Sequence, residues 1–234
     1  MKAAELCKLA TEWLGKEYPG SIIVTELSVA DWGGALIDVA AITETEIVGV
    51  EIKGEGDSPA RLELQGHVYG RVARRMWLLA DESIQAKCFA KCPSGWGRLE
   101  IWEGAVRPLN RAKKRVGEEA VKATRTHPAY NRAVYERDDS TYDPDTAGEE
   151  RALCPWSMCG TLWRDELYDI ARLHRVQTAG RANVLPLTEA ITSQLPMPVI
   201  HAAMIDQLRR RIWRKPVIDN RNPSEKRPVQ KAML

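Results

Sequence analysis

The stretch 49–59, GVEIKGEGDSP, places a glutamate and a lysine two residues apart at the end of an apolar run. Because side chains alternate along a β-strand, Glu51 and Lys53 share one face and Ile52 points to the other. A further carboxylate, Asp38, interrupts the apolar run ALIDVAAI, which a short turn joins to the first run. Two antiparallel strands joined in this way bring Asp38 opposite or diagonal to Glu51.

Two carboxylates that converge in a partly buried place repel each other unless a proton or a cation lies between them. Their oxygen atoms suit Mg²⁺, which binds through one or two carboxylates, water and phosphate oxygens. A neighbouring lysine can orient a metal-bound water and stabilise a pentavalent phosphate. Asp38, Glu51 and Lys53 therefore predict metal-assisted phosphodiester hydrolysis. The alternative is a solvent-facing ion pair with Asp38 in a turn, but the apolar neighbours of all three residues favour catalysis.

The elements that must position these residues follow from the spacing of apolar residues and from turn signals. We expect helix 3–18, strands 21–29, 35–42 and 47–53, a helix from Ser58 to about Arg74, strand 75–80 and a further strand at 97–103. This order predicts an α/β layer fold around one sheet.

The order of these elements, together with Asp38 and the run VEIK, resembles the PD-(D/E)XK phosphodiesterase superfamily, and within it the MmcB-like DNA-repair and prophage nucleases. The resemblance covers about residues 1–105 and implies a restriction-endonuclease-like α-β-β-β-α-β core with a mixed sheet. Ile37 stands where the superfamily's name has proline. The run QGHVY, Gln65 to Tyr69, resembles the Gln-x-x-x-Tyr motif of RecB-like and Cas4-like members.

The resemblance implies roles for four residues of the two central strands. Asp38 and Glu51 would bind Mg²⁺ or Mn²⁺, with the main-chain carbonyl of Ile52 as a further ligand. Lys53 would position the nucleophilic water.

Many superfamily members add a glutamate from the first helix or strand, and Glu5, Glu12 and Glu26 are eligible here. We favour Glu26, because its strand lies beside that of the catalytic aspartate; an exposed strand residue is the alternative. Gln65 would face the site from the following helix, or else be an ordinary exposed helix residue. His67 is about 200° further round that helix and points elsewhere.

The second half of the chain changes in composition. Residues 106–159 are first basic and then acidic, which indicates a linker or exposed loop. Residues 160–215 have helical periodicity, and 162–195 is similar to SAP-type DNA-binding modules. Packing or homodimerisation is the alternative role of this helical part. Residues 216–234 are polar and proline-rich, which predicts a flexible basic tail.

Basic side chains gather in two runs, RAKKR and RRRIWRK. Such runs bind phosphate backbones without sequence preference, although many are only solvated helix faces. We expect the following residues to contact DNA: Lys113, Lys114, Arg115, Arg209, Arg210 and Arg211.

Five cysteines, an odd number, indicate reduced thiols and a cytoplasmic protein. Cys88, Cys92, Cys154 and Cys159 could hold a structural zinc ion, but their spacings differ from the usual two-residue knuckle. No apolar run reaches the length of a membrane span, so we expect no membrane association.

Together these features predict a Mg²⁺- or Mn²⁺-dependent DNA nuclease of repair, recombination or phage DNA processing. A catalytically silent nuclease fold that binds DNA, or one that recruits a protein partner, is the alternative. The sequence leaves open endo- or exonucleolytic action and the choice among double-stranded, branched and single-stranded substrates.

Overall fold

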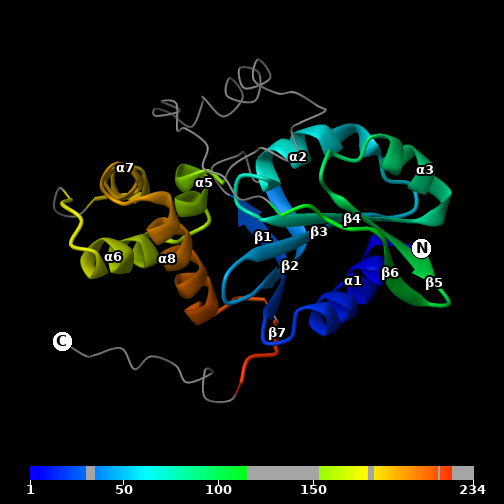
Figure 1. Cartoon of the computed structure of the whole chain (residues 1–234), viewed down its shortest axis with the longest axis horizontal. Coiled ribbons are helices and arrows are strands. Elements are labelled where there is room, and N and C mark those ends of the chain that lie inside the picture. Colours follow the sequence, from blue (N-terminus) through cyan, green and yellow to red (C-terminus); the bar gives the residue numbers. More distant parts are fainter. Residues whose placement is uncertain (30–34, 115–152, 179–181, 216, 223–234) are drawn as a thin grey trace.

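A computed structural model of the chain describes residues 1–29, 35–114, 153–178, 182–215 and 217–222 (Figure 1). Within these residues, seven strands form one mixed sheet in the order β6-β5-β4-β3-β2-β1-β7. The strands are β1 (Ile22–Val29), β2 (Ala35–Ile42), β3 (Ile47–Lys53), β4 (Arg75–Ala80), β5 (Gly97–Trp102), β6 (Ala105–Asn110) and β7 (Ile218–Asp219). The helices are α1 (Ala3–Glu17), the 3₁₀ helix η2 (Pro59–Arg61), α2 (Leu62–Tyr69), α3 (Glu82–Ala90), α5 (Pro155–Gly160), α6 (Arg164–Leu173), α7 (Val184–Gln194) and α8 (Met197–Arg210).

The α/β class and the order of elements from α1 to β4 are as expected, and β5 occupies the further strand at 97–103. Two differences from expectation lie in this half of the chain. Helix α2 ends at Tyr69 rather than near Arg74, because the chain turns at Gly70 before it enters the parallel strand β4. Strand β6, in what was expected to be linker, pairs with β5 as a hairpin and forms one edge of the sheet.

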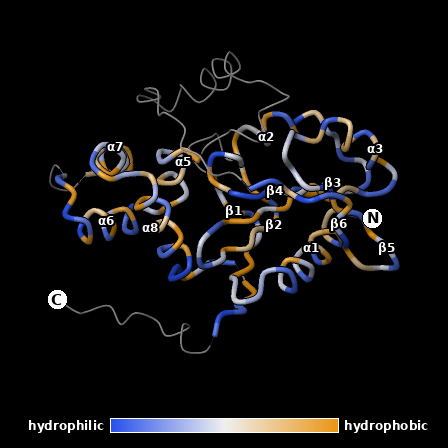
Figure 2. Tube along the Cα trace, in the orientation of Figure 1, coloured by the Kyte–Doolittle hydropathy of each residue, from blue (hydrophilic) through white to orange (hydrophobic). Residues whose placement is uncertain are grey.

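Both faces of the sheet are covered by helices, which explains why β3 is buried along its whole length. Helix α1 lies on one face and packs Leu6, Ala10 and Leu14 against the strands. Helices α2 and α3 lie on the opposite face. Helices α5 and α8 contact β1 and β2, and α6 and α7 lie further from the sheet, with α7 packed on α5 and α8 (Figure 1). Figure 2 shows hydrophobic residues concentrated along these central strands.

The C-terminal helices share one apolar core with the sheet rather than having a core of their own. Leu167 of α6 and Met204 of α8 belong to the same buried cluster as Ile22 of β1. The segment expected to be a loose tail also contributes, since Ile218 and Asp219 pair with β1 as strand β7. Residues 223–234 of that expected tail lie outside the described residues. Among the helices described, none is both long and apolar enough to cross a membrane.

Candidate active site

Three carboxylates occupy matching positions on three neighbouring strands. The antiparallel register of β1 and β2 leaves Glu26 opposite Asp38, and the register of β2 and β3 would set Asp38 opposite Glu51. The β2–β3 ladder stops before this position, where the main-chain N–H of Ile52 donates to Asp38 Oδ2 at 2.8 Å. The strand register therefore brings Asp38 and Glu51 close together across the hairpin, as expected from the sequence.

The regular alternation of side chains breaks at the first two of these positions. Val24 and Leu27 of β1 lie in the same core cluster although they are three residues apart, and so do Ile37 and Ala40 of β2. Glu26 has φ of 54°, in the left-handed region that non-glycine residues rarely adopt. Backbone strain of this kind costs about 1–3 kcal/mol and gathers at functional sites. The break leaves both acidic positions out of the apolar core.

Glu51 and Lys53 form a buried, hydrogen-bonded pair at the end of β3. Only 2% of Glu51 and 4% of Lys53 is exposed, and Lys53 Nζ lies 2.6 Å from Glu51 Oε1. Gln65 of α2 holds both: its Nε2 donates to Glu51 Oε1 at 2.7 Å, and its Oε1 accepts from Lys53 Nζ at 3.1 Å. The surface ion pair considered as the alternative is therefore wrong, because both charged groups are buried.

Tyr69 supports Gln65 from one helical turn further along α2. Its hydroxyl accepts from Gln65 Nε2 at 3.2 Å and donates to the main-chain carbonyl of Leu36 at 2.5 Å. Burial, and then the charge of Glu51, raise the pKa of Tyr69, so the phenol stays protonated as a donor. The sequence analysis assigned Tyr69 no role in the site. Its spacing of four residues from Gln65, which puts both side chains on one face of a helix, could have indicated the contact.

The electrostatics of the site favour a bound cation. Burial, and then the neighbouring charge of Asp38, raise the pKa of Glu51 from 4.5 to about 7. Burial also raises the pKa of Asp38. Glu51 Oε2 is buried without a hydrogen-bond partner. A divalent cation between the two carboxylates would satisfy this oxygen and remove their repulsion, so the donor set fits Mg²⁺ or Mn²⁺.

Within the part of the chain that the structure describes, no three His, Cys, Asp or Glu side chains gather closely enough to hold a metal ion. Two carboxylates would therefore need water and a main-chain oxygen as further ligands, which is usual for Mg²⁺. Glu26 does not complete a triad, because its half-exposed carboxylate forms an ion pair with Lys215. Glu5 accepts from the main-chain N–H of Lys2 at the start of α1, and Glu12 is exposed on that helix.

A cavity of about 730 Å³ opens over the site, between the start of α1, strands β1 to β3 and helix α2. Its charged lining residues are the carboxylates of Glu26, Asp38, Glu51 and Asp57 and the cations of Lys53 and Arg61. The expected strand and helix residues Asp38, Glu51, Ile52, Lys53, Gln65 and Glu26 thus all line one cavity. The side chain of His67, which was expected to point elsewhere, lies outside the part of the chain that the structure describes.

The residues expected to contact DNA do not line this cavity. Lys114 lies 3.5 Å from Glu46, at the turn that precedes β3. The main-chain N–H of Lys113 donates to Gly95. Because β3 spans about 20 Å from that turn to Lys53, these lysines lie at the opposite end of the strand from the site. Arg115 lies outside the described residues.

The three arginines at the end of α8 largely have partners within the protein. Arg209 donates to the main-chain carbonyls of Gly20 and Ile42. Arg210 forms an exposed ion pair with Asp206, one helical turn earlier. Of Arg209 and Arg210, the exposed Arg210 is therefore more accessible to an external phosphate.

The side chain of Arg211 is buried rather than exposed, with only 5% of its surface accessible. Its guanidinium forms a two-pronged ion pair with Glu166 and donates to the carbonyl of Thr161 at 2.8 Å. It also stacks on the rings of Trp163 and Trp213. Its expected role as a DNA contact is therefore replaced by a structural one.

The cysteines considered for zinc are free thiols. Cys88 and Cys92 lie on and just after α3, and Cys154 and Cys159 at the ends of α5. Burial raises the pKa of Cys92 to about 11, which opposes the thiolate form that zinc requires. The described residues give a zinc site no support.

Comparisons with known proteins add little to this description. No protein-family model matches the chain, and no curated protein matches its sequence. A solved structure of a protein of unknown function from Silicibacter pomeroyi is similar with a TM-score of 0.37, at 18% sequence identity, over 60% of this chain and 83% of that one. A similarity at this level carries no argument about family or function.

Proposed function

We propose that the protein is a Mg²⁺- or Mn²⁺-dependent deoxyribonuclease with a restriction-endonuclease-like core of the PD-(D/E)XK type. One observation carries the proposal: Glu51 keeps a buried, unpartnered carboxylate oxygen beside Asp38, and Lys53 lies within hydrogen-bond distance of the same carboxylate. A purely structural ion pair would not need a second carboxylate at this place. Two carboxylates and one lysine at a cavity are a set suited to phosphodiester hydrolysis.

The metal would be held by Asp38, Glu51 and the main-chain carbonyl of Ile52. When bound, such an ion polarises a phosphoryl oxygen and lowers the pKa of a coordinated water. Glu51 must lose a proton when it binds the metal, because its raised pKa keeps the carboxyl group protonated up to about pH 7 in the absence of the cation.

Lys53 would orient the attacking water and stabilise the negative charge of the pentavalent phosphate. Its ammonium is directed by two acceptors, Glu51 Oε1 at 2.6 Å and Gln65 Oε1 at 3.1 Å, and it has a third donor hydrogen for water or phosphate. Tyr69 keeps the Gln65 amide in the orientation that presents its oxygen to Lys53. The four side chains thus form one connected network around the cavity.

The arrangement of strands supports the same proposal. Helix α1, the antiparallel strands β1 to β3, the crossover helix α2 and the parallel strand β4 follow the superfamily's order. Asp38 lies on the second strand, and Glu51 and Lys53 on the third, as the superfamily motif requires. DNA repair, recombination or phage DNA processing is the setting that the resemblance suggests.

The test is incubation of the protein with supercoiled, linear, single-stranded and branched DNA in the presence of Mg²⁺, Mn²⁺ or EDTA. We expect cleavage with either metal, none with EDTA, and a loss of about 100-fold or more in Asp38→Asn and Lys53→Met. Asparagine retains an acceptor for the N–H of Ile52, so this variant should keep its fold. Glu12→Gln is the matched control, because it removes an exposed carboxylate of α1.

Thermal melts of all variants must accompany the assay, so that lost activity is not confused with unfolding. Intact DNA in every lane, from folded protein, would refute the nuclease. Salt-sensitive DNA binding without cleavage would then indicate a catalytically silent DNA-binding protein, and neither property would indicate a protein-interaction role.

A further inference from the structure

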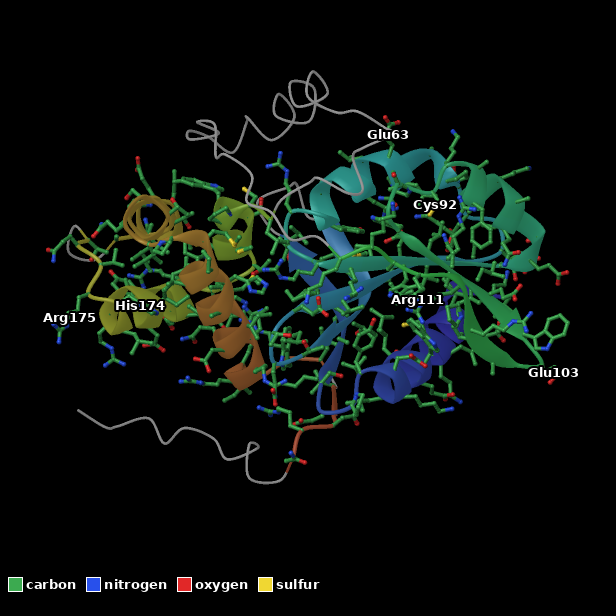
Figure 3. All side chains as sticks on the ribbon, in the orientation of Figure 1. Glu63, Cys92, Glu103, Arg111, His174 and Arg175 are labelled. Atoms are coloured by element: carbon green, nitrogen blue, oxygen red, sulfur yellow. The ribbon has the colours of Figure 1, made fainter. Side chains whose placement is uncertain are left out.

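The inner side of α2 faces the cavity with an unusual mixture of side chains. Leu64, Gln65 and Val68 of α2 line the cavity at the spacing of a single helical stripe, and Arg61, the last residue of η2, continues this stripe just before α2 begins. Such a stripe usually packs into an apolar core, yet Leu64 is 41% exposed. Glu63, by contrast, points outward from the other side of this helix (Figure 3).

A second exposed leucine faces the same cavity from the sheet. Leu36 of β2 is 38% exposed, and with Leu64 it gives the cavity an apolar wall next to the carboxylates. Two large apolar side chains exposed in one cavity indicate a place for an apolar or aromatic part of a ligand. The cavity volume of about 730 Å³ is in the range of sites that enclose a molecule of nucleotide size.

Arg61 is the cation at this cavity that the catalytic network does not use. Four carboxylates and two cations line the cavity, and the ammonium of Lys53 is already bound to Glu51 and Gln65. Arg61 is exposed, and within the described ranges its side chain has no ion-pair partner. A guanidinium in this position is suited to bind a phosphate through two parallel hydrogen bonds.

We propose that Arg61, Leu36 and Leu64 form a subsite for one unpaired nucleotide, which makes single-stranded or locally unpaired DNA the substrate. This inference rests on the proposed nuclease function. Arg61 binds the phosphate next to the scissile one, and the base lies on the two leucines. In an intact duplex both faces of a base are stacked, so the leucine wall can contact only a base that has left the stack.

The experiment measures DNA binding with Ca²⁺ in place of Mg²⁺, because its larger size and looser coordination disfavour cleavage. Fluorescence anisotropy follows three labelled probes: a single strand, the same strand paired with its complement, and that duplex carrying an unpaired flap. We expect the single strand and the flap to bind about tenfold or more tightly than the duplex.

Variants separate the two parts of the subsite. Arg61→Gln should weaken single-strand binding about tenfold and lower the slope of log K against log salt by about 0.7. Leu64→Gln, which keeps helix propensity, should weaken it about tenfold with an unchanged slope. Leu36→Thr should likewise weaken single-strand binding without changing the salt slope. Neither leucine variant should alter the affinity for the duplex. Arg175→Gln is the control, because Arg175 is an exposed arginine on the far side of the helical part (Figure 3).

Equal affinity for the single strand and the duplex, or wild-type binding by the Arg61 and Leu64 variants, would overturn the subsite. Failure of the subsite and failure of the nuclease give different results. Single-strand binding that depends on Arg61, without cleavage under Mg²⁺ or Mn²⁺, would support the subsite and refute the nuclease. Rapid metal-dependent cleavage of plain duplex, at a rate that Arg61→Gln leaves unchanged, would support the nuclease and refute the subsite.

Discussion

The buried carboxylate of Glu51 should make the stability of the metal-free protein fall as pH rises. Its pKa is about 7 in the folded protein, against 4.5 for an ordinary glutamate. Below pH 4.5 the carboxyl group is protonated in both the folded and the unfolded state. Between about pH 4.5 and pH 7 the unfolded state releases the proton and the folded state retains it, so stability is lost as pH rises.

The size of this loss follows from the difference between the two pKa values. At 1.36 kcal/mol for each pH unit between them, Glu51 should lower the free energy of unfolding by about 3 kcal/mol across this range. Glu51→Gln keeps the shape of the side chain and removes the titrating group. Its absolute stability also reflects the lost partner of Lys53, so the informative quantity is the difference in pH dependence between the two proteins.

Urea unfolding in EDTA at a series of pH values from about 4 to about 8 provides the measurement. The free energy of unfolding of the wild type should fall by about 3 kcal/mol relative to Glu51→Gln, and the Glu12→Gln control should follow the wild type. Mg²⁺ at one hundred times its Kd should restore about 2.7 kcal/mol to the wild type at pH 8. It should restore much less to Glu51→Gln.

Parallel pH profiles of wild type and Glu51→Gln would refute the reasoning, because Glu51 would then titrate normally in the folded protein. If Mg²⁺ stabilised the wild type and Glu51→Gln equally, the cation would not bind at Glu51, whatever the pH profiles showed.

Two further predictions concern packing near and far from the site. Gly54→Ala should lower stability by about 1–3 kcal/mol, since the added Cβ would lie 2.5 Å from the main-chain nitrogen of Ala3; a melting temperature equal to the wild type would contradict this close contact. Arg211→Met should cost about 3–5 kcal/mol by leaving the buried carboxylate of Glu166 unpaired, whereas Arg210→Met, at an exposed pair, should cost under about 1 kcal/mol. Unfolding curves measure both, and weakened DNA binding in a fully stable Arg211→Met would show that this arginine faces the nucleic acid instead.

Local patterns in the sequence were enough to predict the elements that carry the site. Apolar runs bounded by turn residues define β2 and β3. Their short connection forces an antiparallel pair, and the extension of its register brings Asp38 opposite Glu51. The side chains of Glu51 and Lys53 share a face because side chains alternate along a strand. Helical spacing in α1 likewise predicted the buried Leu6 and Leu14.

Contacts between distant segments could not be predicted in this way. The basic run at the end of α8 suggests a DNA surface, yet Arg211 pairs with Glu166, 45 residues away, and is buried. Strand β7 was missed because its two residues gain their pairing from β1, far earlier in the chain. Local composition says how polar a segment is, but not whether another segment already satisfies its charges.

The sequence by itself therefore determined which strands carry the carboxylates and the lysine, because periodicity and a short hairpin are local properties of the chain. Only the tertiary structure decided how these groups are used. The packing of α2 on the sheet buries Glu51, raises its pKa and brings Gln65 to Lys53. The same packing turns Arg61 and Leu64 toward the cavity. Burial and long-range contact depend on the whole fold, and they turn an ordinary Glu-x-Lys strand into a candidate catalytic site.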